Sequence, residues 1–151
     1  MWQTESSSLD ASLALAAQIG RNLRGGETLE LISDLGGGKT AFVRGLVAGL
    51  GSTDRVSSPS FTLTNQYRAG QKTLHHFDFY RLNEPGILRA ELAEILQDTD
   101  NIVAVEWADV VADVLPTERL RVKIRASGET SRELQFSYPN SLSYLLTGLA
   151  N

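Results

Sequence analysis

The segment Ser33–Thr40, SDLGGGKT, has the residue types and the spacing of a loop that binds phosphate groups. Its three consecutive glycines can turn their backbone N–H groups inward around an anion, because no Cβ atom stands in the way. Lys39 would place a positive charge on the β- and γ-phosphates of a nucleotide, and the Thr40 hydroxyl would reach a bound Mg²⁺. The segment therefore predicts a site for a nucleoside triphosphate.

Two carboxylates in apolar, strand-like segments could serve the same site. Asp78 lies between Phe77 and Phe79, and Glu106 closes the apolar run IVAVE. Strands disfavour Asp, and an unpaired carboxylate is costly among apolar residues. The alternatives are a solvent-facing residue for Asp78, since alternation places it opposite its aromatic neighbours, and a polar strand end for Glu106. A nucleotide with Mg²⁺ needs nearby carboxylates, which favours the functional interpretation.

Three further side chains near these carboxylates could carry chemistry. His75 and His76 are adjacent, so on a strand they point to opposite faces and cannot hold one metal ion together. We expect one of them to be packed and the other to face solvent. Trp107 follows Glu106 directly, and it could either fill the core or shape the site.

The surrounding pattern predicts the elements that position these residues. We expect helices over 9–23, from about 39 to 50, and over 84–97, 108–115 and 141–149. Strands are expected over 27–32, 61–67, 73–80, 101–107, 120–126 and 132–138, with hairpins joining 61–67 to 73–80 and 120–126 to 132–138. A helix beginning near Lys39 would aim its N-terminal dipole at the bound anion. Gly45 and Gly49 are expected to let this helix pack closely on a sheet.

This order of elements predicts an α/β fold with three layers, in which helices flank a central sheet of mixed strand direction, as in P-loop NTPases. Ligands of such open sheets bind outside the carboxyl ends of the strands. We therefore expect the phosphate-binding loop, Asp78 and Glu106 to meet at one edge of the sheet.

Composition limits the classes of protein to consider. The 151 residues fit one domain, 1–151, and the absence of cysteine excludes a disulfide partner. A net charge of −4 with scattered arginines argues against a large nucleic-acid surface. We find neither a signal peptide nor an apolar run long enough to span a membrane, so we expect a cytoplasmic protein without membrane contact.

Four segments in this order resemble the bacterial TsaE family, the small ATPases of tRNA threonylcarbamoyladenosine biosynthesis: SDLGGGKTAFVRGL, SSPSFTLTNQY, HHFDFYRL and VEWAD. The resemblance covers essentially the whole domain. It implies Mg²⁺-dependent hydrolysis of ATP and the partners TsaB and TsaD, which transfer the threonylcarbamoyl group to adenosine 37 of tRNAs that read ANN codons. ATP hydrolysis would sustain turnover of that complex, and contact with tRNA would be indirect.

Carried over position by position, the resemblance also implies the residues of the site. Lys39, Asp78 and Glu106 are the predicted catalytic residues. Thr40, Glu106 and Asp78 are the predicted ligands of Mg²⁺. The segment 57–64 matches a loop that changes with the nucleotide state. The predicted ATP-binding residues are Leu35, Gly36, Gly37, Gly38, Lys39, Thr40, Ala41 and Arg132.

Three positions depart from the family pattern. Ser33 replaces a Gly, and because Ser adopts positive φ less readily, we expect weaker nucleotide binding or a strained turn. Ser60 replaces a common Thr, and Asp109 stands where Glu is common. The last two changes keep a hydroxyl and a charge, so we expect them to preserve function.

Two other functions remain open at this point. The chain could be a nucleotide-gated binding module that hydrolyses little ATP by itself and presents a conformational state to a partner. It could also be a small-molecule kinase, although Arg81 and Arg89 are too few and too far apart to form the Arg-rich lid that such enzymes use.

Overall fold

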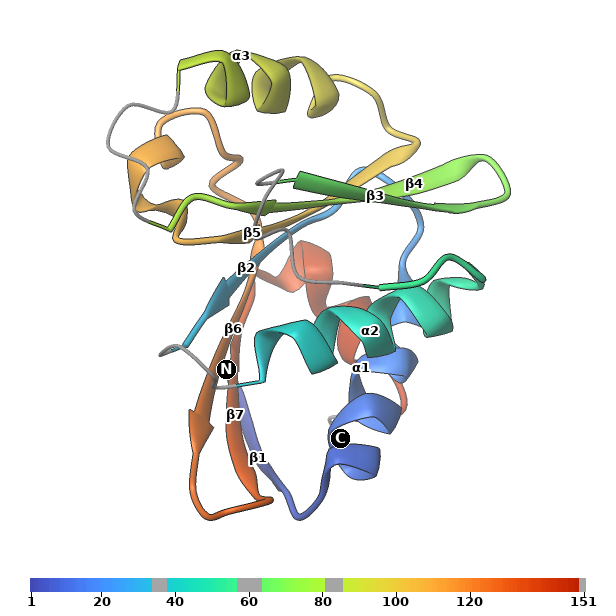
Figure 1. The fold of residues 1–151 in the computed structure, drawn as a ribbon, viewed down its shortest axis with the longest axis vertical. Helices are drawn as coiled ribbons and strands as arrows, with labels where there is room; N and C mark the ends of the chain where they lie inside the picture. The colour runs from blue at the N-terminus through green and yellow to red at the C-terminus, as the bar shows by residue number, and fades with distance from the viewer. Residues whose placement is uncertain (34–37, 57–63, 81–85, 150–151) are drawn as a thin grey trace.

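The computed structural model describes residues 1–33, 38–56, 64–80 and 86–149, and in them one mixed sheet is flanked by helices (Figure 1). The strand order is β1-β7-β6-β2-β5-β4-β3. The strands are β1 (Trp2–Ser6), β2 (Thr28–Ile32), β3 (Thr64–Ala69), β4 (Lys72–Asp78), β5 (Asn101–Glu106), β6 (Leu120–Ala126) and β7 (Arg132–Ser137). The helices are α1 (Leu9–Asn22), α2 (Lys39–Leu50) and α3 (Gly86–Ile95), with 3-10 helices η1 (Ala108–Val111) and η2 (Asn140–Leu146).

The centre of the sheet is parallel. β2 pairs in parallel with β5 and with β6, and β5 pairs in parallel with β4. In this register Glu106 stands beside Leu31 on one side and beside Asp78 on the other. The carboxyl ends of β2, β5 and β4 therefore lie at one edge, where ligands of open α/β sheets bind.

Helices cover both faces of the sheet, as the sequence predicts (Figure 1). On the face of α1 and α2, the core includes Leu31, Phe42 and Ala104, which are almost fully buried. On the face of α3 and η1, a second core contains Phe77 and Val105. Residues of β5 alternate between the two cores, which explains why this strand has a continuous apolar sequence without a polar face.

The predicted reason for the small residues of α2 is wrong in one respect. Gly45 and Gly49 lie against α1 and not against the sheet: a Cβ atom at Gly49 would lie 2.0 Å from the carbonyl oxygen of Ala17, and one at Gly45 would lie 2.6 Å from Cβ of Ala16. A Cβ atom at Gly20 of α1 would likewise lie 2.3 Å from the carbonyl oxygen of Leu46. These small residues allow α1 and α2 to pack closely against each other while both contact the core on this face of the sheet.

Other differences concern the ends of the chain and the short helices. The sequence pattern missed β1, an edge strand whose residue Trp2 stacks on Phe136 of β7 at a centroid distance of 5.3 Å. The helices expected over 108–115 and 141–149 are the 3-10 helices η1 and η2. Both predicted hairpins are present, as β3–β4 and β6–β7. In the described ranges no helix is long and apolar enough to cross a membrane.

Candidate functional site

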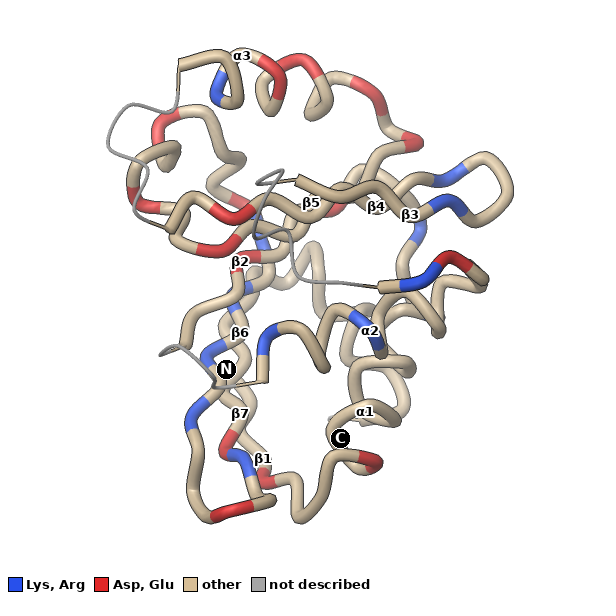
Figure 2. The backbone as a smooth tube through the Cα atoms, viewed as in Figure 1, with Lys and Arg blue, Asp and Glu red and all other residues tan. Residues whose placement is uncertain are grey.

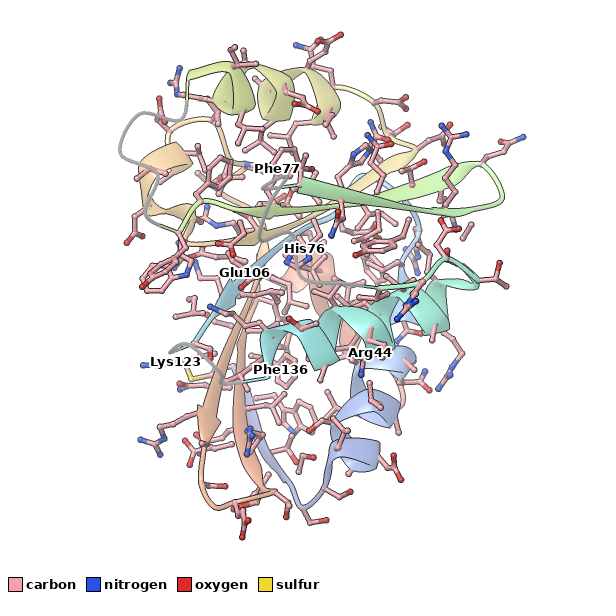
Figure 3. All side chains as sticks on the ribbon, viewed as in Figure 1. Arg44, His76, Phe77, Glu106, Lys123 and Phe136 are labelled. Atoms are coloured by element: carbon pink, nitrogen blue, oxygen red, sulfur yellow. The ribbon has the colours of Figure 1, made fainter. Side chains whose placement is uncertain are left out.

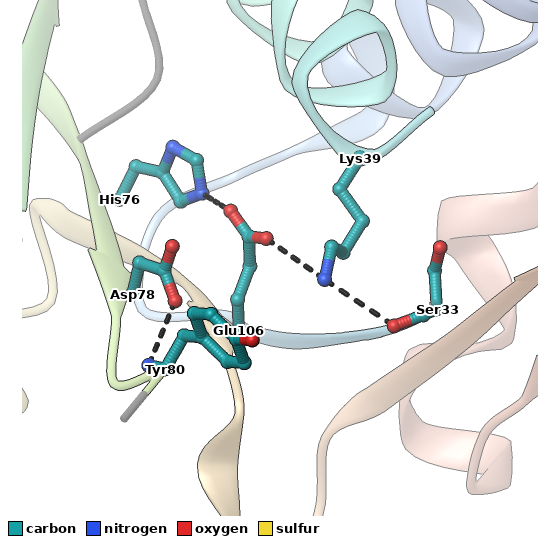
Figure 4. A network of polar contacts seen from close by, with 6 residues as sticks. All are labelled: Ser33, Lys39, His76, Asp78, Tyr80 and Glu106. Carbon is teal, nitrogen blue, oxygen red and sulfur yellow. Dashed lines mark hydrogen bonds and ion pairs between the residues drawn. The ribbon is translucent and has the colours of Figure 1, made fainter. Parts of the chain in front are cut away.

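The three predicted catalytic residues meet at the carboxyl edge of the sheet (Figure 4). Lys39 is the first residue of α2, and its Nζ lies 3.2 Å from Oε1 of Glu106 at the end of β5. The same ammonium donates a longer hydrogen bond, 3.4 Å, to the carbonyl oxygen of Ser33. Lys39 and Glu106 are 8% and 5% exposed, so this ion pair lies largely out of water. Asp78 ends β4 directly beside Glu106.

Both carboxylate oxygens of Glu106 have partners. While Oε1 lies near Lys39, Oε2 lies 2.5 Å from Nε2 of His76, a residue that is 0% exposed. Burial by itself would raise the pKa of Glu106, but the hydrogen bond from His76 and the charge of Lys39 outweigh it and hold that pKa below the ordinary value of 4.5. Glu106 is therefore ionised at neutral pH.

Asp78 is in a different electrostatic environment. Its Oδ1 accepts a hydrogen bond of 2.9 Å from the backbone N–H of Tyr80, which fixes the side chain where the strand ends. Burial raises the pKa of Asp78 above the ordinary 3.8, the negative charge of Glu106 adds to this, and the N–H of Tyr80 and the charge of Lys39 offset only part of it. The pKa values of these two neighbouring carboxylates are thus displaced in opposite directions.

The start of α2 has the backbone that a phosphate-binding loop needs. Gly38 caps the helix with a φ of 106°, a left-handed conformation that glycine adopts at little cost. Nε of Arg132, on β7, lies 3.6 Å from the position that a Cβ of Gly38 would take. The structure therefore places Arg132 beside the end of the predicted loop, across the sheet edge from the carboxylates.

Next to Gly38 and Arg132 lies a cavity of about 250 Å³. Apolar side chains supply most of its wall, from the first two turns of α2 and from the β6–β7 hairpin. The apolar residues that line it include Ala41, Phe42, Ile124 and Leu134. Its polar lining consists of Arg132 and Glu129, which carry opposite charges, and of Ser12 and Thr130. A concave, mainly apolar pocket with a few polar groups in its wall is a common form of ligand site.

Trp107 shapes the site and does not fill the core, which settles the two interpretations that the sequence left open. Its indole is 40% exposed, with a centroid 4.9 Å from the ring of Tyr80 and 5.2 Å from Nζ of Lys39. Its φ of 56° makes it the one non-glycine residue of the described part with positive φ. Such a conformation costs about 1–3 kcal/mol and tends to occur at functional sites.

The φ of Ser33 is not positive, so this residue lacks the left-handed strain that the loss of glycine led us to expect, and its carbonyl contributes to the surroundings of Lys39. The predicted residues Leu35, Gly36 and Gly37 and the part 57–63 of the switch-like loop lie outside the described residues. Thr40 and Ala41 are half-buried in the first turn of α2.

The prediction of one solvent-facing histidine is wrong, because both faces of β4 are covered. His76 lies on the face of α2, and Phe77 on the opposite face, toward α3 (Figure 3). His75 shares that opposite face and pairs with Oδ1 of Asn101 at 3.0 Å. Sequence reasoning thus missed His76 as a site residue. Its spacing of two from Asp78 on one strand, which places both side chains on the same face, could have revealed it.

The residues present fit a nucleotide with Mg²⁺. No group of three or more His, Cys, Asp or Glu side chains in the described ranges is arranged to hold a metal ion by itself. Mg²⁺ at nucleotide sites usually takes only one or two carboxylates, together with phosphate oxygens and water. An ionised Glu106 with Asp78 beside it meets that requirement.

Comparison with known proteins agrees with this geometry. Residues 6–134 match the family model described as "Threonylcarbamoyl adenosine biosynthesis protein TsaE". A Bacillus subtilis protein named tRNA threonylcarbamoyladenosine biosynthesis protein TsaE is 37% identical over 116 residues, 74% of this chain and 70% of that protein. A Nostoc protein of the same name is 34% identical over 131 residues, 85% of this chain and 80% of that protein.

A solved structure shows the same fold. The crystal structure of Bacillus subtilis YdiB superimposes with a TM-score of 0.80 at 31% identity, covering 98% of this chain and 93% of that one. The predicted α/β fold with a mixed sheet is confirmed by this likeness and by the strand order. The match of the family model and the identity to these relatives show that the chain belongs to the TsaE family.

Proposed function

We propose that this chain is a Mg²⁺-dependent ATPase that acts with TsaB and TsaD to form N6-threonylcarbamoyladenosine at adenosine 37 of tRNAs reading ANN codons. The observation that carries the proposal is the contact of Lys39 with Glu106 at the start of α2, directly after the left-handed Gly38. A cation and a carboxylate at the end of a glycine-rich loop are the two groups that a nucleotide with Mg²⁺ requires. Family membership supplies the link to tRNA.

In this proposal the phosphates of ATP bind the loop from Leu35 to Thr40, where Lys39 and the N-terminus of α2 neutralise their charge. The cavity beside Gly38 would receive the adenosine, against Ala41 and Phe42, with Arg132 at its border.

The two carboxylates would divide the work according to their pKa values. Glu106, whose pKa is lowered, is suited to hold Mg²⁺ together with Thr40, whereas Asp78, whose pKa is raised, is suited to assist there and to accept a proton from the attacking water. Mg²⁺ supplies positive charge to the phosphate oxygens as the bond to the leaving group weakens. Lys39 orients the same phosphates.

Contact with tRNA would pass through the partners. The chain carries 18 acidic residues against 14 Lys and Arg. In Figure 2 the basic residues are spread over several elements, and acidic residues follow α3. A weak and scattered positive charge is poorly suited to hold a phosphate backbone. A role in tRNA modification would place the protein in the cytoplasm.

A second candidate is a nucleotide-gated binding module with little turnover of its own. The exposed ring of Trp107 lies beside Lys39, so a change at the phosphate site would reach a surface that a partner can contact. Glu106→Ala separates the two: it abolishes turnover in both cases but spares ATP-dependent binding to TsaB and TsaD only in the second. Membership of the TsaE family favours both over a small-molecule kinase.

The deciding experiment measures ATP hydrolysis by the purified protein, alone and with TsaB and TsaD from the same source. Hydrolysis that rises with the partners and disappears in Lys39→Ala supports the proposal. Wild-type protein that neither binds nor hydrolyses ATP under either condition contradicts it. Wild-type rates in Glu106→Ala would contradict the role given to that carboxylate.

A further inference from the structure

We propose that His76 is a positioning residue, which holds the carboxylate of Glu106 in its working orientation when Lys39 turns toward bound phosphates. The inference rests on the proposed function, because it concerns how the same site works. It adds a residue outside the predicted site and a role that depends on hydrogen bonding alone.

The two partners of Glu106 differ in their freedom to move. Lys39 holds Oε1 through a long side chain at the start of a helix, and the phosphates would compete for its ammonium group. His76 holds Oε2 from the middle of β4, which pairs with β3 on one side and β5 on the other. Its ring is completely buried, so it cannot follow a ligand. His76 is therefore the partner that remains.

The chemistry of the contact makes His76 the hydrogen-bond donor. A carboxylate that forms an ion pair with Lys39 can only accept hydrogen bonds, so Nε2 of His76 carries the proton that points at Glu106. Nδ1 is buried without a hydrogen-bond partner among the residues that the structure describes. Burying an unsatisfied ring nitrogen lowers stability.

Packing alone does not explain a histidine at this position. On the same face, Leu74 on its own strand and Ala104 beside it in the register are apolar, while Asn65 stands opposite it on β3. An apolar side chain would pack against Leu74 and Ala104 without an unpaired nitrogen. His76 contributes what an apolar residue cannot, an N–H that points at Glu106 (Figure 4).

When nucleotide is bound, His76 would limit the side-chain torsions of Glu106. Its side chain has several rotatable bonds, and a carboxylate with no fixed partner would populate several rotamers. With Oε2 held by His76, Oε1 stays directed to the side of Lys39 and the phosphate-binding loop. Partners that orient a metal-binding carboxylate in this way typically change affinity or activity by about 10- to 100-fold when they are removed.

The first experiment compares three variants in the complex with TsaB and TsaD. His76→Ala should lower kcat for ATP hydrolysis by about 10- to 100-fold. His76→Gln should recover most of that loss, because its Nε2 amide can donate to the same oxygen. His75→Ala is the matched control: it is the adjacent buried histidine, but it faces α3 and pairs with Asn101, so kcat should stay as in wild type.

Nucleotide affinity provides a readout that does not depend on turnover. ADP binding is measured by calorimetry with Mg²⁺ and with EDTA. In EDTA, the affinity of His76→Ala for ADP should stay within about threefold of the wild-type value. The increase in ADP affinity that Mg²⁺ produces in the wild type should be mostly lost in this variant. Equal losses of affinity in EDTA and Mg²⁺, or a kcat of His76→Ala equal to wild type, would overturn the proposal. The same holds if His76→Gln is as slow as His76→Ala.

A measurement on the protein without nucleotide separates this inference from the proposed function. NMR relaxation of the Glu106 side chain is compared in Lys39→Met, which removes one partner, and in Lys39→Met with His76→Gln or His76→Ala. We expect the Glu106 side chain to stay ordered in Lys39→Met and in Lys39→Met with His76→Gln. It should lose order in Lys39→Met with His76→Ala. Loss of order in Lys39→Met itself would overturn the inference even if the wild-type protein hydrolyses ATP. If wild type binds no ATP but Glu106 stays ordered, only the proposed function fails.

Discussion

Asp78 and Glu106 stand beside each other in the register of β4 and β5, yet their pKa values are displaced in opposite directions. The difference comes from their partners: Glu106 has His76 and Lys39 in direct contact, while Asp78 accepts a hydrogen bond from the backbone N–H of Tyr80. Pairs of titratable groups with separated pKa values are typical of sites that use one group as a charge and the other as a base.

The pH profile of hydrolysis should report Asp78. Because burial raises the pKa of Asp78 above 3.8, kcat should fall on the acidic side, as Asp78 becomes protonated, with an apparent pKa above that value. Asp78→Asn should lower kcat by about 10²- to 10⁴-fold and remove this acidic limb. The check is a kcat profile of both proteins with TsaB and TsaD. A wild-type rate in Asp78→Asn would rule out its role as proton acceptor.

The contribution of Glu106 to the free energy of unfolding should depend on pH. Its folded pKa lies below 4.5, so its stabilising contribution is present above pH 4.5 and is lost as the pH falls through the folded pKa. Glu106→Gln should therefore lower the free energy of unfolding at neutral pH, by about 1–3 kcal/mol, with a smaller difference in acid. Urea denaturation at several pH values measures this.

The control for that experiment is an exposed ion pair. Glu133 pairs with Arg125 at 2.9 Å on the surface of the β6–β7 hairpin, where solvent screens the charges. Glu133→Gln should change the free energy of unfolding by no more than about 0.5 kcal/mol at any of these pH values. If Glu106→Gln and Glu133→Gln change the free energy of unfolding equally at each pH, the buried position of Glu106 does not increase its contribution to stability.

The close contact of α1 and α2 should be sensitive to one methyl group. Gly49→Ala places a Cβ 2.0 Å from the backbone oxygen of Ala17, which cannot move without displacing α1. We expect a loss of about 2–3 kcal/mol in the free energy of unfolding, although Ala favours a helix over Gly. Gly128→Ala is the control, because its Cβ meets only the flexible hydroxyl of Ser131, and it should stay within about 0.5 kcal/mol. Thermal and urea unfolding measure both.

Trp107 should report nucleotide binding by its fluorescence. Nζ of Lys39 lies 5.2 Å from the centre of the indole, so displacement of this charge toward phosphates changes the electrostatic field on the ring. In a Trp2→Phe background, which leaves Trp107 as the sole tryptophan, ATP should change the emission. Adding Lys39→Ala should abolish the change. An unchanged spectrum in the Trp2→Phe protein at saturating ATP, shown by calorimetry, would contradict the expected movement of Lys39.

Local patterns in the sequence predicted much of the fold. The apolar period after the loop, the glycine at the end of α2 and the alternation in the hairpins are contained in short contiguous segments, and the corresponding elements are present. The reactive groups could also be predicted from local sequence, because Lys39 follows a run of glycines and the two carboxylates lie among apolar neighbours. Their roles in binding ATP and Mg²⁺ stay predictions.

The arrangement of the site was decided by tertiary structure. His76 and Glu106 are 30 residues apart, and their contact depends on the register of β4 against β5. Whether a histidine of β4 faces solvent depends on which helices cover each face, and the position of Arg132 beside Gly38 depends on the neighbour of β2 in the sheet. The sequence by itself thus determined the kinds of element and the reactive groups, because those follow from neighbouring residues, whereas long-range strand pairing and helix packing decided which of these groups meet.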